Sequence, residues 1–440
     1  MRRIQNLLLG SLAVMSLWAT PSLATSKGVA SDTFVNPIMD QGADPWVVRY
    51  DGYYYMTMTT GNNVTIWRSS TLTDIASGEQ TIAYDPGTTD FSDIWAPELH
   101  HFGLHWYIYV AMDHHTDNKT HRMYVLESAN NDPLSTYHLV GEIHDPSNQW
   151  AIDGTVLTLH DKLYFIWSGW ASVRDQIQRL YIAPMKSPTQ IDGARHLLSS
   201  PYLSWETSKA PINEGPEVLQ HAGKTFVIYS ANASWTNNYC LGMLTFKGGN
   251  PLVQINWIKS PKPVFSSTAF VKGPGHASFT TSENGSQWWI VYHAARYAGS
   301  GWDRTIRTQP FMWSKHGIPE FGLPIPLTES LPLPSGEKQI RITYYPIKQN
   351  NVSSTFAVSV THAGLYGMYV RYENASGTMT MQNLYVNGMP TLPLTFPNLG
   401  VQGNVSNLFT TVSLKAGKNI LRFMEGPLAA KVLFSQIVEK

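Results

Sequence analysis

The sequence is poor in charged residues, and the few charges balance. Asp, Glu, Lys and Arg make up only 14% of the 440 residues, with 31 acidic and 31 basic side chains and a formal net charge of zero. Nucleic acid is usually bound through a basic surface, so this balance argues against a nucleic-acid partner. A neutral small molecule or a neutral polymer fits the composition better.

Cysteine is almost absent. Cys240 is the only one, which excludes an intrachain disulfide and predicts a small apolar residue buried in a strand. Aromatic residues are abundant in contrast, at 12% of the chain with 15 Trp and 22 Tyr. We expect most of them to fill the space between packed sheets, and the remainder to form flat platforms for a ligand.

Long apolar runs are lacking outside the N-terminus. Residues 1–24 read as a signal peptide, with Arg2 and Arg3 before an apolar stretch and a small-residue cleavage site that ends at Ala24. No later segment reaches the roughly 18 continuous apolar residues of a membrane span. The mature form is therefore expected to begin near Thr25, without a membrane anchor, and to be secreted, either extracellular or periplasmic.

Helical periodicity is nearly missing between residues 32 and 331, and one aromatic-rich strand pattern recurs there. Successive copies lie roughly 50 to 65 residues apart, the spacing expected of propeller blades. The pattern predicts an all-β fold, a five-bladed β-propeller over residues 32–331. The five copies are GYYYMT at Gly52, LHWYIY at Leu104, KLYFIW at Lys162, KTFVIY at Lys224 and QWWIVY at Gln287.

An ionisable residue lies about ten residues before each copy, at a similar phase of the repeat. If the copies are blades around one axis, these residues begin equivalent inner strands and should converge on one pocket. The five are Asp44 in GADPWV, Glu98 in WAPELH, Asp153 in AIDGTV, Glu214 in NEGPEV and His276 in GPGHAS.

The pattern changes after residue 331. Residues 332–337 are rich in proline and small residues and read as a linker. Residues 338–440 contain alternating strands and an Asn387-Gly388 turn, which predict a β-sandwich of about 100 residues. Residues 409–414 and 419–423 are expected to pair around a turn at Gly417.

A pocket that receives Asp44, Asp153 and Glu214 could hydrolyse a glycosidic bond. That reaction needs one protonated carboxyl group as acid and one ionised carboxylate as base or nucleophile. Three carboxyl groups close together cannot all ionise freely, so repulsion and burial should raise the pKa of at least one of them. Single Asp-Pro or Glu-Gly-Pro sequences more often form turns; their recurrence at one phase of a repeat favours catalysis.

The motifs GADPWV, WAPELH, WAIDGTVL, NEGPEVL and GPGHASF, in this order and spacing, resemble glycoside hydrolase family 43. The resemblance implies a five-bladed β-propeller that acts on arabinan, arabinoxylan or xylan with inversion at the anomeric carbon. The segments TTGNNVTIWRSSTLTDI, HRMYVLES, IWSGW and NYCLGMLT are most similar to the family's secreted α-L-arabinofuranosidases. Plant cell-wall arabinan or arabinoxylan and their oligosaccharides are then the expected substrates.

The resemblance also implies roles for individual residues. Asp44 matches the general base, Glu214 the general acid, and Asp153 the third carboxylate, which raises the acid's pKa and orients it. An inverting pair should stand roughly 6.5 to 9.5 Å apart, to leave room for water. Glu217 is the nearest competitor for the acid, but the family pattern places the acid before Gly-Pro.

Further residues are matched by the same resemblance. His276 matches a histidine at the propeller axis that in several relatives holds a calcium ion or water; a hydrogen-bonded core histidine is the equal alternative. No cofactor is expected to be required, and any metal role of His276 should act through water because calcium favours oxygen ligands. Trp95 is expected to wall the sugar pocket, and Glu98 to order its strand.

An arginine that reaches a substrate hydroxyl is expected in DRTIRTQPFMW, where Arg307 is preferred over Arg304 because it precedes Thr-Gln-Pro. Trp302 and Asp303 replace a cysteine and a glycine that similar enzymes tend to carry.

The segments GLYGMYVRYEN, LYVNG and LKAGKNILRF resemble a carbohydrate-binding β-sandwich, although the last strand lacks the family's usual aspartate. Packing against the propeller is the alternative role.

The leading hypothesis is an inverting, exo-acting α-L-arabinofuranosidase. A β-xylosidase or an endo-arabinanase on the same propeller would share its axial residues. A non-catalytic sugar-binding propeller is the alternative from another class, and it would need a lost acid or base.

Overall fold

Antiparallel strands make up nearly all of the regular structure. The structure is a computed structural model, and it describes residues 29–30, 33–338, 341–350, 353–424 and 429–439. Within these ranges the only helical elements are α1 (Ser204–Thr207) and two 3-10 turns, η1 (Ile75–Ser77) and η2 (Gln254–Asn256). The expectation of an all-β chain is confirmed. The predicted signal peptide, residues 1–24, lies outside the described residues.

Five antiparallel sheets follow one another along the chain, and we number them I to V. Their strands, in hydrogen-bonded order, are as follows. Sheet I contains β3 (Ala43–Tyr50), β4 (Tyr53–Thr59), β5 (Val64–Ser69) and β6 (Glu79–Tyr84); sheet II contains β7 (Phe91–Phe102), β8 (His105–His114), β9 (Asp117–Ser128) and β10 (Tyr137–Glu142). Sheet III contains β11 (Ala151–Leu159), β12 (Lys162–Gly169), β13 (Arg179–Ser187) and β14 (Gln190–Ile191), with β15 (His196–Ser199) also paired to β13. Sheet IV contains β16 (Asn213–His221), β17 (Lys224–Ala231), β18 (Cys240–Phe246) and β19 (Trp257–Lys259); sheet V contains β20 (Lys272–Thr281), β21 (Trp288–Ala295), β22 (Arg304–Trp313) and β23 (Pro319–Glu320).

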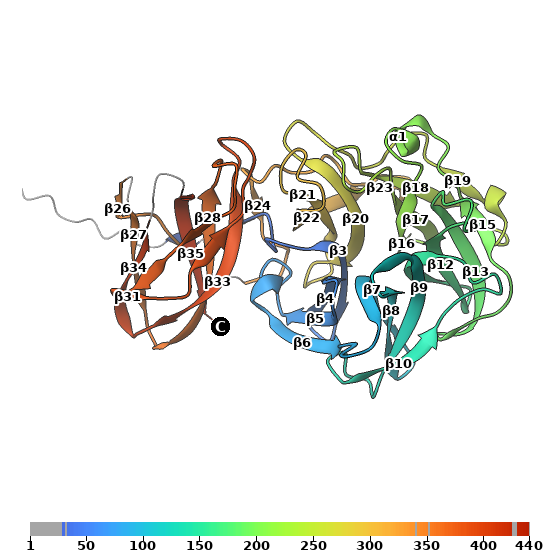
Figure 1. Ribbon diagram of the computed structural model, residues 1–440, viewed down its shortest axis with the longest axis horizontal. Coiled ribbons are helices and arrows are strands. Elements are labelled where there is room, and N and C mark those ends of the chain that lie inside the picture. The colour runs from blue at the N-terminus through green and yellow to red at the C-terminus, as the bar shows by residue number, and fades with distance from the viewer. Residues whose placement is uncertain (1–28, 31–32, 339–340, 351–352, 425–428, 440) are drawn as a thin grey trace, which may run out of the picture.

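The first strands of the five sheets contact one another in a closed ring. β3 contacts β7, β7 contacts β11, β11 contacts β16, β16 contacts β20, and β20 returns to β3. Figure 1 shows the sheets side by side around a shared centre. Residues that begin these five strands are therefore brought together, although they are spread over much of the chain.

The aromatic-rich strands fill the spaces between neighbouring sheets. Side chains alternate across a strand, so one strand supplies two interfaces. In β4, Tyr54 and Met56 join the cluster shared with sheet V, whereas Tyr55 joins the cluster shared with sheet II. Cys240, at the start of β18, is 3% exposed, which confirms its predicted burial in a strand. It packs in the cluster between sheets III and IV.

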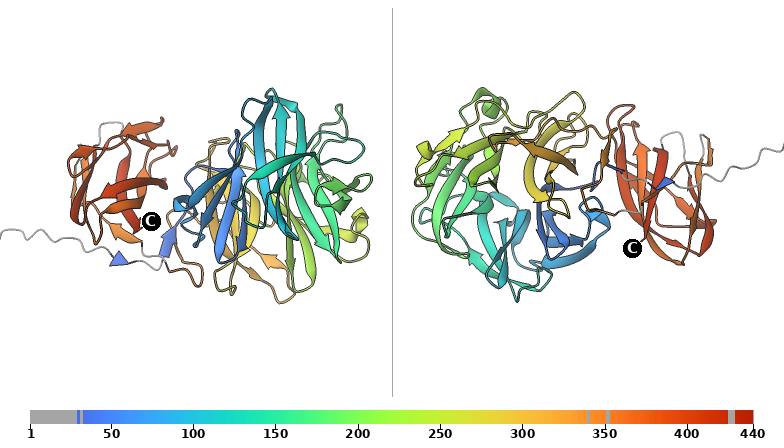
Figure 2. Two further views of the ribbon diagram at one scale, coloured as in Figure 1. Left: turned by 90° about the horizontal axis from the view of Figure 1, so that it is seen from below. Right: turned by 180° about the vertical axis from the view of Figure 1, so that it is seen from behind.

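Two further five-stranded sheets enclose one apolar cluster in the C-terminal part. One contains β1 (Val29–Ala30), β25 (Ile342–Tyr344), β35 (Lys431–Glu439), β28 (Gly364–Glu373) and β33 (Ser406–Leu414). The other contains β26 (Lys348–Gln349), β27 (Ser353–Val360), β34 (Gly417–Met424), β30 (Leu384–Val386) and β31 (Met389–Pro390); β29 (Thr380–Gln382) pairs separately with β32 (Leu394–Phe396). Figure 2 shows both sheets to one side of the ring.

The predicted pairing of residues 409–414 with 419–423 is wrong. β33 pairs with β28, and β34 pairs with β27 and β30, so the two strands lie in different sheets. Val412 and Phe423 reach the same cluster from opposite sides. The turn at Gly417 thus connects two layers, and alternation of apolar residues alone does not distinguish such a connection from a hairpin.

The C-terminal sheets are fastened to the ring by buried polar contacts. β24 (Ser330–Pro332) pairs with β2 (Thr33–Val35). The Glu337 carboxylate, at the end of the predicted linker, accepts hydrogen bonds from the Leu72 N–H at 2.5 Å and the Thr73 hydroxyl at 2.9 Å. Arg341 forms an ion pair with Asp74. The segment that joins the two parts is therefore held at both ends.

Candidate active site

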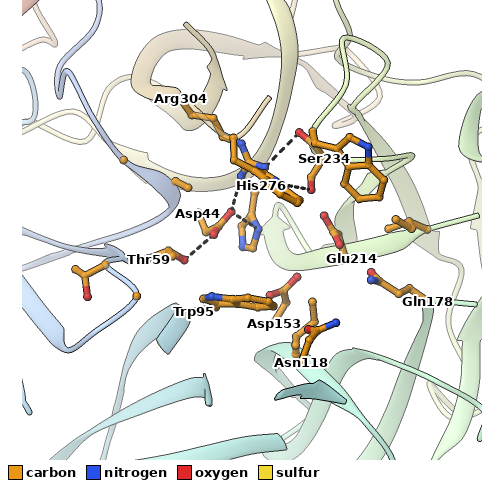
Figure 3. A pocket seen from close by; sticks show the side chains of 18 of the residues that line it. Asp44, Thr59, Trp95, Asn118, Asp153, Gln178, Glu214, Ser234, His276 and Arg304 are labelled. Atoms are coloured by element: carbon orange, nitrogen blue, oxygen red, sulfur yellow. Dashed lines mark hydrogen bonds and ion pairs between the residues drawn. The ribbon is translucent and has the colours of Figure 1, made fainter. Parts of the chain in front are cut away.

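A cavity of about 1070 Å³ opens where the first strands of the five sheets meet. Six of the candidate site residues from the sequence line it: Asp44, Trp95, Asp153, Glu214, His276 and Arg304. Figure 3 shows their side chains pointing toward a common space. The predicted convergence of distant motifs on one pocket is thus observed for four of the five ionisable residues, Asp44, Asp153, Glu214 and His276. Sheet II contributes Trp95 of the WAPELH motif.

A β-bulge in each first strand turns these side chains toward the cavity. The register of β3 slips between Ala43 and Trp46, and equivalent slips occur in the four other first strands. Each first strand has a residue with a left-handed backbone in such a slip, with φ between 42° and 55°: Asp44, Ala96, Asp153, Gly215 and His276. β7 and β20 have a second slip each, at Asp93 with φ 44° and at Gly273 with φ 54°. Bulges re-aim side chains and are frequent beside functional sites, where such backbone strain is retained.

Glu98 does not join the other ionisable residues at the cavity, which corrects the prediction that all five would converge. The residue of sheet II that has the left-handed backbone is Ala96, and Glu98 lies two positions further along β7. In β16, Glu217 likewise lies two positions after Gly215, the residue with the left-handed backbone. Both glutamates are buried, and neither lines the cavity. Burial raises the pKa of both carboxyl groups well above the ordinary value. The negative charge of Glu98 raises the pKa of Glu217 further.

Asp44 is held in an environment that favours its ionised form. The Thr59 hydroxyl donates a hydrogen bond to Oδ2 at 2.6 Å, His276 Nδ1 lies 3.1 Å from Oδ1, and Arg304 lies 3.6 Å from it. Burial alone would raise the pKa of Asp44, but the positive charge of His276 and its hydrogen bond outweigh burial and hold the pKa well below its usual value.

Glu214 is in the opposite situation. Burial and the neighbouring negative charge of Asp153 raise the pKa of Glu214 to about 8, against the smaller effect of a hydrogen bond that Tyr239 donates to Oε1 at 2.8 Å. Burial raises the pKa of Asp153 to about 6, and Asp153 Oδ2 accepts the Gly215 N–H at 2.9 Å. One cavity therefore holds an ionised and a protonated carboxyl group near neutral pH.

His276 is a charged neighbour of all three carboxyl groups. Burial lowers the pKa of His276, but Asp44, Asp153 and Glu214 together raise it to about 9. The described residues contain no group of three or more His, Cys, Asp or Glu side chains placed to hold a metal ion. A protonated imidazole bound to Asp44 does not fit a direct metal ligand. The predicted contact of His276 with calcium through water stays a prediction, and the chemistry below needs no step through an ion.

Arg304 lines the cavity, whereas Arg307 does not, so the sequence-based preference for Arg307 is revised. Residues three apart in a strand point to opposite faces. Arg307 in β22 is 1% exposed and donates to the Thr305 hydroxyl and the Ala295 carbonyl. Burial lowers the pKa of Arg307 to about 10. The Thr-Gln-Pro context that favoured Arg307 contains no information about the face of the strand.

The comparison with protein families agrees with this geometry. Residues 34–319 match the model of glycosyl hydrolases family 43, which is well over half of the chain. The chain belongs to this family. It is 36% identical over 338 residues to an extracellular exo-alpha-(1->5)-L-arabinofuranosidase of Streptomyces avermitilis, covering 73% of this chain and 70% of that protein.

Two further relatives extend the comparison. Alpha-L-arabinofuranosidase 43 of Humicola insolens is 31% identical over 417 residues, covering 89% of this chain and 81% of the relative. The crystal structure of an alpha-L-arabinofuranosidase from Lactobacillus brevis superposes with a TM-score of 0.62 at 35% identity, covering 67% of this chain and 98% of that one.

Several residues of this family-43 site were not found from the sequence. Thr59 and Tyr239 contact Asp44 and Glu214 directly, and His293 Nδ1 accepts the Asp44 backbone N–H at 3.0 Å. Burial lowers the pKa of His293 to about 3, which keeps the ring neutral. These residues lie on second strands or in loops, so the sequence motifs of the first strands do not predict them. Trp235 and Trp302 also line the cavity.

The described residues include no helix that is both long and apolar enough to cross a bilayer.

Proposed function

We propose that this chain is an inverting, exo-acting α-L-arabinofuranosidase that releases terminal L-arabinofuranose from arabinan or arabino-oligosaccharides. The observation that carries the proposal is that Asp44, Asp153 and Glu214 line one cavity, where the surroundings of Asp44 favour its ionised form and those of Glu214 its protonated form. Inverting hydrolysis needs one group of each kind. Both relatives are α-L-arabinofuranosidases and the one from Streptomyces avermitilis is exo-acting, which supports the choice of sugar and of exo action.

Asp44 acts as the general base in this proposal. It accepts a proton from a water molecule as the water oxygen forms a bond to the anomeric carbon. The Thr59 hydroxyl, which accepts the Ala96 N–H at 2.8 Å, fixes the Asp44 carboxylate by donating to Oδ2. The other oxygen stays near His276, whose positive charge keeps Asp44 ionised before each turnover.

Glu214 acts as the general acid. It donates its proton to the leaving oxygen as the glycosidic C–O bond breaks, so the leaving sugar departs as a neutral alcohol. Asp153 holds the adjacent Gly215 N–H and keeps the pKa of Glu214 high by its negative charge. One proton enters Asp44 and one leaves Glu214 in each turnover, and exchange with solvent restores both.

Neighbouring residues would hold the terminal sugar. Trp95 stacks on His121 with ring centroids 4.0 Å apart, which fixes its ring as a wall of the cavity. Arg304 lies close enough to Asp44 to reach a substrate hydroxyl beside the base. We therefore assign the substrate-binding arginine to Arg304, and we keep His276 as a contact beneath the sugar.

The same proposal extends to the architecture and the location of the chain. The closed ring of first strands supports a five-bladed β-propeller over residues 32–331, with sheets I to V as blades. The two layers around one cluster support a β-sandwich over residues 338–440, resembling a carbohydrate-binding module and joined by residues 332–337. Removal of residues 1–24 on export would place the enzyme outside the cytoplasm, with plant cell-wall arabinan or arabinoxylan as its polymer substrate.

Two rivals share the propeller, namely a β-xylosidase and an endo-arabinanase. The test is to incubate the enzyme with nitrophenyl α-L-arabinofuranoside, nitrophenyl β-xyloside and linear arabinan. We expect arabinose from the first and third, with no internal oligosaccharides from arabinan. Release of xylose without arabinose would overturn the choice of sugar. No turnover of any substrate would favour a sugar-binding protein.

Inversion is tested by adding methanol to the arabinofuranoside reaction. A covalent glycosyl intermediate would pass its sugar to methanol with retained configuration. We expect no methyl α-L-arabinofuranoside, because the attacking water is held by Asp44 and no such intermediate forms. Its appearance would contradict the assignment of Asp44 as a base.

A further inference from the structure

Two exposed tryptophans stand together at the edge of the cavity. Trp302 is 67% exposed and Trp235 is 45% exposed, and both line the cavity. Their ring centroids are 5.7 Å apart with an angle of 62° between the planes, so the two rings form a corner. No other tryptophan among the described residues is as exposed as these two. Large apolar rings left in water beside a cavity mark a binding surface.

The tryptophan corner lies on the side of Glu214. Glu214 in β16 is paired with Ser230 in β17, and the loop that follows β17 carries Trp235. The same loop ends with Tyr239, whose hydroxyl donates to Glu214. Figure 3 shows Ser234 on the same side of the cavity as Glu214, with Asp44 and Thr59 on the other side. A group that receives the proton of Glu214 would therefore leave toward Trp235.

The corner is held in place before any ligand binds. Trp302 Nε1–H donates to the Ser234 hydroxyl at 3.2 Å, and the Gly299 N–H donates to Asn237 Oδ1 at 3.0 Å, which joins the loops of sheets IV and V. Arg296 Nε donates to both oxygens of Asp303, next to Trp302, at 2.9 and 3.1 Å. A rigid platform loses less entropy when it binds a ligand than a mobile one does.

The C-terminal sheets support this loop as well. Arg296 Nη1 also donates to Asp40 Oδ1 at 2.9 Å, and that oxygen accepts the Ser406 hydroxyl at 3.0 Å. Gly400 approaches the ring of Tyr297 so closely that an added Cβ would lie 2.8 Å from it. Gly400 and Ser406 thus stabilise the start of the loop that carries Trp302, through Tyr297 and through Asp40 and Arg296.

We propose that Trp235 and Trp302 form the subsite for the first sugar of the leaving group, a neutral pentose ring that stacks in the corner while Glu214 protonates its oxygen. The proposal rests on the proposed function, because it needs Glu214 to be the acid. Indole presents a wide apolar face to the C–H groups of a sugar ring. The polar lining on this side includes the neutral side chains of Gln178 and Ser234, which suit hydroxyl groups. The cavity volume of about 1070 Å³ is slightly above the range of about 300 to 1,000 Å³ usual for small-ligand sites, so it leaves room for a second ring.

The test compares two substrates that differ only beyond the scissile bond. Linear arabinotriose places a sugar in the corner, whereas α-L-arabinofuranosyl fluoride places none there. For Trp302→Ala and for Trp235→Ala we expect kcat/KM on arabinotriose to fall about 5- to 50-fold, because stacking is lost. We expect kcat/KM on the fluoride and the inhibition constant of arabinose to stay at the wild-type values. The control is Tyr202→Ala, which removes an aromatic ring that is also 67% exposed but does not line the cavity.

Each outcome decides the proposal. An equal loss on both substrates would show that the tryptophans only support the loop, and unchanged kinetics on both would show that the corner binds no sugar; either result overturns the subsite. If wild-type enzyme cleaves xylosides and not arabinofuranosides, the proposed sugar fails instead. The same comparison with xylotriose and xylosyl fluoride then tests the corner independently.

Discussion

The bottom of the cavity and its edge are built in different ways. Asp44, Asp153, Glu214 and His276 form the bottom, at bulges in the first strands, and are 15% exposed or less. Trp235 and Trp302 form the edge, in loops after second strands, and are 45% and 67% exposed. The residues at the bottom lie at equivalent positions in the repeated sheets, whereas the two tryptophans at the edge come from sheets IV and V. This difference suggests that the ring provides the chemistry and the loops select the substrate.

Removal of the base should have the largest effect. Asp44→Asn leaves a side chain that cannot accept a proton from water, so we expect kcat on nitrophenyl α-L-arabinofuranoside to fall about 10³- to 10⁴-fold. Asn tolerates the left-handed backbone at this position. Asp51→Asn is the matched control, because Asp51 has φ 47°, close to the 55° of Asp44, but lies at an exposed turn. If Asp44→Asn were as active as Asp51→Asn, Asp44 would not be the general base.

Substitutions at the two arginines of β22, Arg304 and Arg307, should distinguish an effect on substrate binding from an effect on stability. Lysine lacks the forked guanidinium, so Arg304→Lys should lower kcat/KM about 10- to 100-fold through lost contacts to Asp44 and the Ser234 carbonyl. Arg307→Lys should leave kcat/KM of the folded enzyme near wild type and lower Tm, because Arg307 is buried among Thr305 and Ala295. Steady-state kinetics and thermal melting measure both. A kinetic defect in Arg307→Lys with none in Arg304→Lys would reverse the assignment.

Two substitutions should shift the pH profile in opposite directions. Glu214 must be protonated to act as an acid, so kcat/KM should fall as the pH rises through the pKa of about 8. Asp153→Asn removes a negative charge that raises this pKa, and the alkaline limb should move to lower pH. Tyr239→Phe removes a hydrogen bond that favours the ionised form, and the limb should move to higher pH. Shifts of the same sign in both variants would contradict this assignment of the limb to Glu214.

Much of the bottom of the cavity was predictable from the sequence, because a repeat places equivalent residues at equivalent points around an axis. The repeat predicted that Asp44, Asp153 and Glu214 share one pocket, where the structure places them, and the family resemblance then implied the role of each. The all-β fold followed from the strand pattern, and the burial of Cys240 from its being a single cysteine, which behaves as a small apolar residue.

Two of the errors concern which residues of a strand face the cavity. Glu98 looked equivalent to Asp44, but the bulge of β7 centres on Ala96, and a bulge leaves no mark in the sequence that fixes its position. Arg307 and Arg304 differ only in the face of one strand. Contacts from loops, such as Tyr239 to Glu214 and Trp302 to Ser234, depend on how distant segments fold together and could not be read from local patterns.

The most direct test is whether Glu214 acts as the general acid and Asp44 as the general base. Dinitrophenolate leaves without protonation, whereas a sugar alcohol does not, so the two variants should respond differently to the leaving group. We predict that Glu214→Gln loses about 10³-fold in kcat/KM on arabinotriose but little on dinitrophenyl α-L-arabinofuranoside, and that Asp44→Asn loses activity on both. Glu217→Gln, a buried glutamate three residues away that does not line the cavity, should match wild type on both substrates. Equal losses of Glu214→Gln on the two substrates, or wild-type activity of Asp44→Asn on either, would contradict the account.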